Sequence, residues 1–219
     1  MARLRSSFTK HLIEAGCDEA GRGCLAGPVV AAAVILPKNY RHKKLTDSKQ
    51  LSADERFELR GHILRDADAW AVAEVSHQEI DQINILNASY KAMHLAVDRL
   101  AIRPELLLID GNRFKPHNDV PFECIIKGDA KFLSIAAASV LAKTYRDELM
   151  QRLAQQYPGY GWNTNVGYPT PEHRNGIRGL GITPYHRRSF QLLPAQLELF
   201  EGIDEVEMVV QGTETRVDL

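Results

Sequence analysis

Runs of apolar residues separated by polar turns predict a series of short strands. Ala69 to Ser76 alternates apolar and polar side chains, which indicates a strand with one buried face. Val29 to Leu36 is rich in valine and alanine and ends at Pro37. The five predicted strands are Leu12 to Asp18, Val29 to Leu36, Ala69 to Ser76, Leu106 to Ile109 and Phe122 to Ile126.

Apolar residues three and four positions apart predict helices around these strands. Ser52 is a typical N-cap, and Asp54 and Glu55 follow in the first turn, where the helix dipole favours acids. The middle of the longest helical segment, Ile135 to Ala142, is almost all small or apolar, which predicts a buried helix. The predicted helices cover residues 53–65, 77–82, 84–100, 130–156, 171–179 and 194–201.

Strands that alternate with helices indicate an α/β fold. The first two strands are joined by too few residues for a helical crossover, so we expect them to be antiparallel and the five-stranded sheet to be mixed. We expect residues 1–156 to form the α/β domain. Residues 157–219, rich at first in Gly, Pro, Asn and Tyr, should form a C-terminal region of helices and loops with an acidic tail, in one structural unit with the domain.

Composition and charge limit the class of protein. The 219 residues are 44% hydrophobic and 25% charged, which is typical of a soluble globular protein. The net charge is −1, but residues 195–219 hold seven acids and one base, so residues 1–194 hold 21 acids and 26 bases, a charge of +5. That basic body permits a polyanionic partner. Three cysteines without metal-type spacing and the lack of a long apolar run predict a cytoplasmic protein with no membrane contact.

Carboxylates stand at or just past the ends of three predicted strands: Asp18 with Glu19, Asp110, and Asp129. Ligands of open α/β sheets gather at strand ends. Four acids without a histidine or cysteine cluster indicate hard oxygen ligation of Mg²⁺ or Mn²⁺, which would also relieve the repulsion between them. Two such ions, about 3.5–4 Å apart, can clamp the attacking and leaving oxygens of a phosphodiester. Taken singly, each acid is better explained as a turn residue; together they predict a metal site.

The glycines after the first acid pair predict a functional turn. Gly21 and Gly23 let a backbone approach a ligand closely, and Arg22 between them suits a phosphate oxygen. Adjacent strand residues point to opposite faces. We therefore expect the chain to leave strand geometry at Asp18 and Glu19, so that both can serve one site.

Several motifs in a fixed order carry a resemblance. They are Asp18-Glu19-Ala20-Gly21-Arg22-Gly23 with Leu25-Ala26-Gly27-Pro28-Val29, Thr46-Asp47-Ser48-Lys49, Leu108-Ile109-Asp110-Gly111, Gly128-Asp129-Ala130-Lys131, Ser134 to Ser139 with Leu141-Ala142-Lys143, Tyr168, and His186-Arg187-Arg188-Ser189-Phe190. Over roughly residues 12–190 the chain resembles the ribonuclease HII family, a far more specific signal than any single motif. Cys24 stands where the family more often has proline, which bears on the rigidity of the turn.

The resemblance implies a ribonuclease H-like fold with a helical C-terminal extension that binds substrate. It implies an endonuclease that cuts the RNA strand of RNA–DNA hybrids and nicks on the 5′ side of single ribonucleotides in duplex DNA, leaving 5′-phosphate and 3′-hydroxyl ends. Separately from the resemblance, we expect the protein to be a monomer. The four acids match the family's metal-binding catalytic residues. Gly21, Arg22 and Gly23 match the segment that recognises the ribonucleotide, and Tyr168 matches the tyrosine that stacks on the sugar at the RNA–DNA junction.

Other polar residues are candidates for phosphate contact: Lys49, Ser139, Lys143, Arg187 and Arg188. Ser139 and Lys143 share a helix face with Asp147, so a Lys143–Asp147 ion pair with a small packing serine is an equal alternative. We interpret His173 as structural, because an all-carboxylate site needs no histidine base. Two alternative functions stand beside the main one: a DNA-directed nuclease of the same fold, and a hybrid-binding module without activity.

Overall fold

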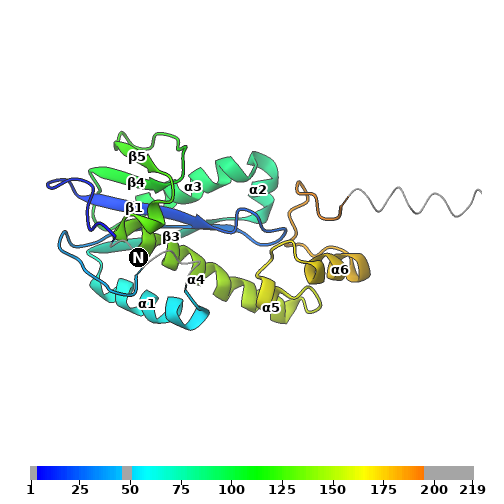
Figure 1. The fold of residues 1–219 in the computed structure, drawn as a ribbon. Coiled ribbons are helices and arrows are strands. Elements are labelled where there is room, and N and C mark those ends of the chain that lie inside the picture. The colour runs from blue at the N-terminus through cyan, green and yellow to red at the C-terminus, as the bar shows by residue number, and fades with distance from the viewer. Residues whose placement is uncertain (1–3, 46–50, 195–219) are drawn as a thin grey trace, which may run out of the picture.

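A computed structural model describes residues 4–45 and 51–194. Its centre is a mixed sheet in the order β3-β2-β1-β4-β5 (Figure 1). The strands are β1 (Glu14–Ala20), β2 (Val29–Ile35), β3 (Ala69–Val75), β4 (Leu106–Asp110) and β5 (Phe122–Ile125). β2 pairs antiparallel with both β1 and β3, whereas β4 pairs parallel with both β1 and β5. The five predicted strands and the mixed sheet are confirmed.

Helices cover both faces of this sheet (Figure 1). They are α1 (Ala53–Asp66), α2 (His77–Ile83), α3 (Ile85–Asp98), α4 (Leu133–Gln156), α5 (Trp162–Asn165) and α6 (Pro171–Leu180). Residues of α3 such as Met93 pack on Ala31 and Ala33 from one side. From the other side, α1 and α4 pack on Ala32 and Val34. α4 approaches β1 very closely, because a Cβ at Gly16 would lie 2.3 Å from the Ser134 carbonyl carbon.

The far half of α4 holds the C-terminal helices in place. A separate apolar cluster joins Leu25 and Ala26, from the β1–β2 connection, to Met150 of α4 and to Trp162 and Ile177 of α5 and α6. α5 and α6 therefore lie beyond the end of the sheet, beside the turn that follows β1 (Figure 1). None of the helices in the described ranges is both long and apolar enough to cross a bilayer.

Several boundaries differ from the prediction. β1 does not end at Asp18: it continues through Asp18, which pairs with Ala32, and Glu19, which pairs with Ala31. The expected departure from strand geometry at the acid pair is therefore wrong, since the backbone pairing with β2 keeps both residues extended. A 3₁₀ turn, Gly128–Ala130, precedes α4. The predicted helix at 194–201 lies almost wholly outside the described residues, as do the acidic tail and residues 46–49 with Lys49.

Candidate active site

Parallel pairing brings the predicted acids to one edge of the sheet. β1 and β4 run in the same direction, so Asp18 and Glu19 at the end of one strand lie near Asp110 at the end of the other. The 3₁₀ turn after β5 carries the buried Asp129. This turn is tied to β4, because the backbone N–H of Gly128 donates to Asp110 Oδ1 at 2.7 Å. Carboxylates from three segments that are distant in sequence thus come to the same edge of the sheet.

The charges of these acids act on one another. Burial raises the pKa of Asp18 well above its usual value, and the negative charges of Glu19 and Asp110 raise it further. A hydrogen bond from the Ser139 side chain works in the opposite direction. Burial also raises the pKa of Glu19; Arg22 lowers it, and Asp110 raises it again. The negative charge of Asp110 therefore raises the pKa of both Asp18 and Glu19, and a bound cation would relieve this repulsion.

Glu19 shows how the acids suit a cation. Its side chain is 8% exposed, and Arg22 Nη1 holds one carboxylate oxygen, Oε1, at 3.0 Å. The other oxygen, Oε2, is buried and has no hydrogen-bond partner, an arrangement that proteins rarely leave uncompensated. Within residues 4–45 and 51–194, however, no three acid, histidine or cysteine side chains lie close enough together to form a finished metal site. The carboxylate oxygens suit a hard divalent cation. In this structure, however, Glu19 contacts Arg22 and Asp110 accepts from the Gly128 N–H.

Two buried arginines support the turn after β1 from behind. Arg187 donates to the carbonyl oxygens of Arg22 at 3.0 Å, Gly27 at 2.9 Å and Pro28 at 3.2 Å. It is fully buried, and burial lowers its pKa to about 10. The position of Arg187 therefore does not support the predicted contact with phosphate, because its guanidinium is hydrogen-bonded to backbone carbonyls inside the protein.

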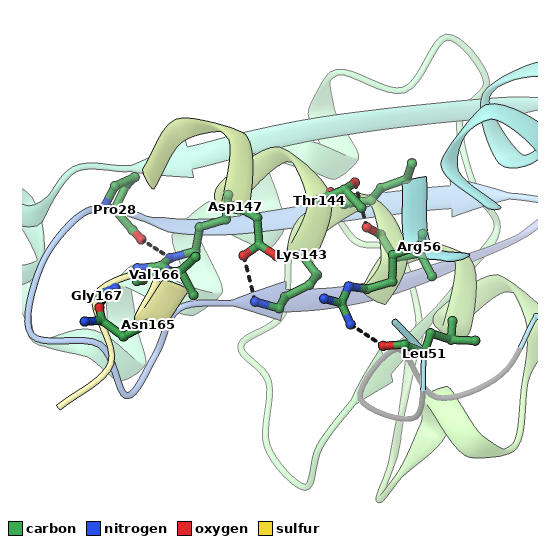
Figure 2. Close-up of polar contacts among 12 residues, drawn as sticks. Pro28, Leu51, Arg56, Lys143, Thr144, Asp147, Asn165, Val166 and Gly167 are labelled. Atoms are coloured by element: carbon green, nitrogen blue, oxygen red, sulfur yellow. Dashed lines mark hydrogen bonds and ion pairs between the residues drawn. The ribbon is translucent and has the colours of Figure 1, made fainter. Parts of the chain in front are cut away.

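Sequence reasoning missed the second of these arginines. Arg146 of α4 is 1% exposed and donates to the carbonyls of Ala26 at 3.0 Å, Pro28 at 3.1 Å and Val166 at 2.8 Å. Pro28 and Val166 come from two different loops that lie side by side (Figure 2). No local signal distinguished Arg146, because the same half of α4 also carries Lys143, Asp147, Glu148 and Arg152. Arg146 joins the turn after β1 to the loop that carries Tyr168.

Tyr168 stands beside the glycine-rich turn. Its ring carbon Cε1 lies 3.9 Å from the position of a Cβ at Gly23, and the residue is 42% exposed. The two loops are also joined directly, because the N–H of Leu25 donates to the carbonyl of Gly167 at 2.8 Å. The structure thus brings Gly21, Arg22 and Gly23 together with Tyr168.

The other candidate residues differ in exposure and in the groups that they contact. Lys143 Nζ contacts Asp147 Oδ1 at 2.7 Å (Figure 2), which is the ion pair given above as the alternative to phosphate contact. Ser139 is buried at Asp18. Arg188 is exposed, and its backbone N–H donates to Asp81 at 2.9 Å. His173 is fully buried.

The chain and its fold are similar to those of known proteins. The family model described as ribonuclease HII matches residues 15–193. A ribonuclease HII from Bacteroides fragilis is 65% identical over 194 residues, which cover 88% of this chain and 96% of that protein. The structure resembles a ribonuclease H2 from Pyrococcus horikoshii (27% identity, TM-score 0.69, 82% and 94% coverage). It also resembles the ribonuclease HII of a PCNA complex from Archaeoglobus fulgidus (28% identity, TM-score 0.72, 86% and 100% coverage).

Proposed function

This chain belongs to the ribonuclease HII family of metal-dependent endonucleases that cut RNA in RNA–DNA hybrids, and we propose that it also nicks duplex DNA on the 5′ side of a single embedded ribonucleotide. The observation that carries this proposal is the position of Tyr168, whose partly exposed ring stands next to Gly23. Family membership sets aside the two alternatives, a DNA-directed nuclease and a hybrid-binding module without activity.

Asp18, Glu19, Asp110 and Asp129 are the proposed ligands of divalent cations, Mg²⁺ or Mn²⁺. The buried and unpartnered Oε2 of Glu19 and the raised pKa of Asp18 support this assignment. When bound, a pair of cations supplies activation of the attacking water and stabilisation of charge on the leaving 3′ oxygen. Ser139 orients Asp18 by its hydrogen bond. Because Arg22 holds Glu19 in this structure, cation binding and the Arg22–Glu19 ion pair compete for the same carboxylate.

The glycine-rich turn and Tyr168 read the sugar. At a single nucleotide only the 2′-hydroxyl distinguishes RNA from DNA, so its recognition needs close polar contact. Gly23 is exposed and leaves the backbone of the turn open to such contact, whereas Gly21 packs against Arg146 and fixes the shape of the turn. Arg22, whose side chain is 52% exposed, is available to a phosphate. The Tyr168 ring stacks on the neighbouring deoxyribose and rejects a further hydroxyl by steric and desolvation effects.

The C-terminal region, residues 157–219, provides Tyr168 and forms the substrate-binding part of the protein, with the exposed Arg188 as a phosphate contact. Lys143 contacts phosphate as well once its ion pair with Asp147 breaks. Lys49, which lies outside the described residues, is a further proposed phosphate contact. The enzyme acts as a monomer in the cytoplasm. Its three unpaired cysteines support a reducing compartment.

The test uses duplex DNA that carries one ribonucleotide, incubated with the enzyme in Mg²⁺, Mn²⁺ or EDTA, with an all-DNA duplex and a uniform RNA–DNA hybrid alongside. We expect metal-dependent nicking on the 5′ side of the ribonucleotide and no cutting of the all-DNA duplex. Cleavage of the uniform hybrid alone would remove the junction role of Tyr168. Equal cleavage of the all-DNA duplex would remove 2′-hydroxyl reading.

A further inference from the structure

Two buried histidines adjoin Tyr168 and take no part in the chemistry proposed above. His173 is on α6, and His186 follows in the next loop; they are 0% and 1% exposed. The Nδ1 atom of His173 lies 2.9 Å from the carbonyl oxygen of Tyr168. Its Nε2 atom lies 2.9 Å from Trp162 Nε1 and 3.1 Å from His186 Nε2. A chain of ring nitrogens therefore ends on the backbone of Tyr168.

The partners determine where each proton sits. A carbonyl oxygen can only accept, so His173 must carry its proton on Nδ1 to bond Tyr168. In a neutral ring, Nε2 of His173 is then an acceptor, which matches the indole N–H of Trp162, a group that can only donate. His186 accepts at Nδ1, so in its neutral form it carries its proton on Nε2 and shares the single lone pair of His173 Nε2 with the Trp162 N–H. The backbone N–H of Thr183 donates to that Nδ1 at 2.9 Å, which completes the chain.

This arrangement fixes the direction of every bond in the network. A second proton on His173 Nε2 would face the donors of Trp162 and His186, and a second proton on His186 Nδ1 would face the N–H of Thr183. Arg174, a cation beside His173, disfavours protonation of that ring, and His173 and His77 disfavour protonation of His186 whenever they are charged themselves. Both rings are therefore neutral and each is held in a single tautomer.

We propose that His173, oriented by His186 and Trp162, is a positioning residue that sets the backbone of Tyr168 and thereby the preference for ribonucleotide junctions. This inference rests on the proposed junction role of Tyr168. Its physical basis is the Nδ1–H donated to the Tyr168 carbonyl, a carbonyl that also accepts from the Thr170 N–H at 2.8 Å. An error of a fraction of an ångström in the stacking ring lowers the rate at the junction, where reactive geometry depends on it.

A matched pair of substitutions separates positioning from packing. His173→Asn keeps an N–H near the position of Nδ1 and loses the Nε2 acceptor, whereas His173→Gln keeps a polar group near Nε2 and loses the Nδ1 donor. The measured quantity is the cleavage rate at an embedded ribonucleotide divided by the rate on a uniform hybrid. Tyr160→Phe is the control, because Tyr160 stacks on Trp162 in the same cluster but donates to Gly181.

We expect His173→Gln to lower this ratio about tenfold or more, toward the value of Tyr168→Ala, and His173→Asn and Tyr160→Phe to stay within about twofold of the unmodified enzyme. Equal ratios in the Asn and Gln variants, with Tyr168→Ala lowered, would overturn the positioning role alone. An unchanged ratio in Tyr168→Ala would overturn the junction role and this inference together.

A spectroscopic measurement on the unmodified enzyme does not depend on any variant folding. Nitrogen-15 NMR of the imidazole rings distinguishes the two tautomers. We expect His173 to carry its proton on Nδ1 and His186 on Nε2. The opposite tautomer at His173 would leave the Tyr168 carbonyl without its donor and would overturn the inference.

Discussion

The side chain of Arg146 lies directly against the backbone of Gly21. A Cβ at Gly21 would stand 2.0 Å from Arg146 Nε, and Gly21 has a φ of +96°, a conformation that favours glycine. Arg146 also donates to the carbonyls of Ala26, Pro28 and Val166. The turn proposed to read the ribonucleotide therefore rests on a buried guanidinium that is also joined to the loop of Tyr168.

Gly21→Ala should destabilise the protein by about 2–4 kcal/mol, because the new methyl group overlaps Arg146 and the backbone is strained. Gly61→Ala, in the exposed middle of α1, is the matched control: a Cβ there meets no atom within 4 Å. It should raise the free energy of unfolding by about 0.5–1 kcal/mol. Urea denaturation of both variants checks the two opposite signs, and a neutral effect of Gly21→Ala would contradict the close contact.

Arg146→Lys should lower the free energy of unfolding by about 2–4 kcal/mol, because a lysine cannot reproduce three guanidinium contacts and leaves buried carbonyls without donors. It should also lower cleavage at embedded ribonucleotides more than cleavage of uniform hybrids. Arg152→Lys, at an exposed position of the same helix, controls for the change of cation. Equal stability in the two variants would show that Arg146 does not support the loops.

Asp110→Asn should nearly abolish cleavage, by on the order of 10²–10³-fold or more, while RNA–DNA hybrid binding stays largely intact. The amide oxygen can still accept from the Gly128 N–H, so the turn that carries Asp129 keeps its anchor. Hybrid binding and cleavage are measured on the same preparation, with Asp98→Asn on the exposed side of α3 as the control. Unchanged turnover in Asp110→Asn would remove this residue from the catalytic set.

The buried histidines should make stability depend on pH. Burial lowers the pKa of His186 from 6.5 to about 4, and it lowers the pKa of His173 as well. Above about pH 6.5 both the folded and unfolded states are neutral at these rings, and no stability is lost. As the pH falls from about 6.5 to about 4, the unfolded state takes up protons that the native state refuses, so the free energy of unfolding falls by up to about 3 kcal/mol.

Asp18 and Glu19 titrate in the opposite sense, because their raised pKa makes the native state bind protons more readily. The histidine contribution is therefore obtained as a difference between the native protein and His186→Phe, from urea denaturation at several pH values. The variant should show a smaller loss of stability toward about pH 4. Parallel curves for the two proteins would contradict a neutral, buried His186.

The sequence was most informative where local signals determine structure. The cap of α1 at Ser52 and the alternation of β3 depend on neighbouring residues, and both were predicted correctly. The convergence of acids could be predicted because parallel strands end at the same edge. The buried arginines could not. Arg146 and Arg187 bond carbonyls 120 and 165 positions away, and arginine is rarely buried, so a surface or phosphate role was the natural expectation.

β1 runs without interruption to Ala20, and the glycine-rich turn begins at the next residue. On the proposed function, two of the metal ligands, Asp18 and Glu19, lie in the paired strand, and only Ala20 separates Glu19 from the turn that recognises the sugar. A shift of the turn is then also a shift of a proposed metal ligand, so recognition of the sugar and binding of the cation depend on the same short segment of chain.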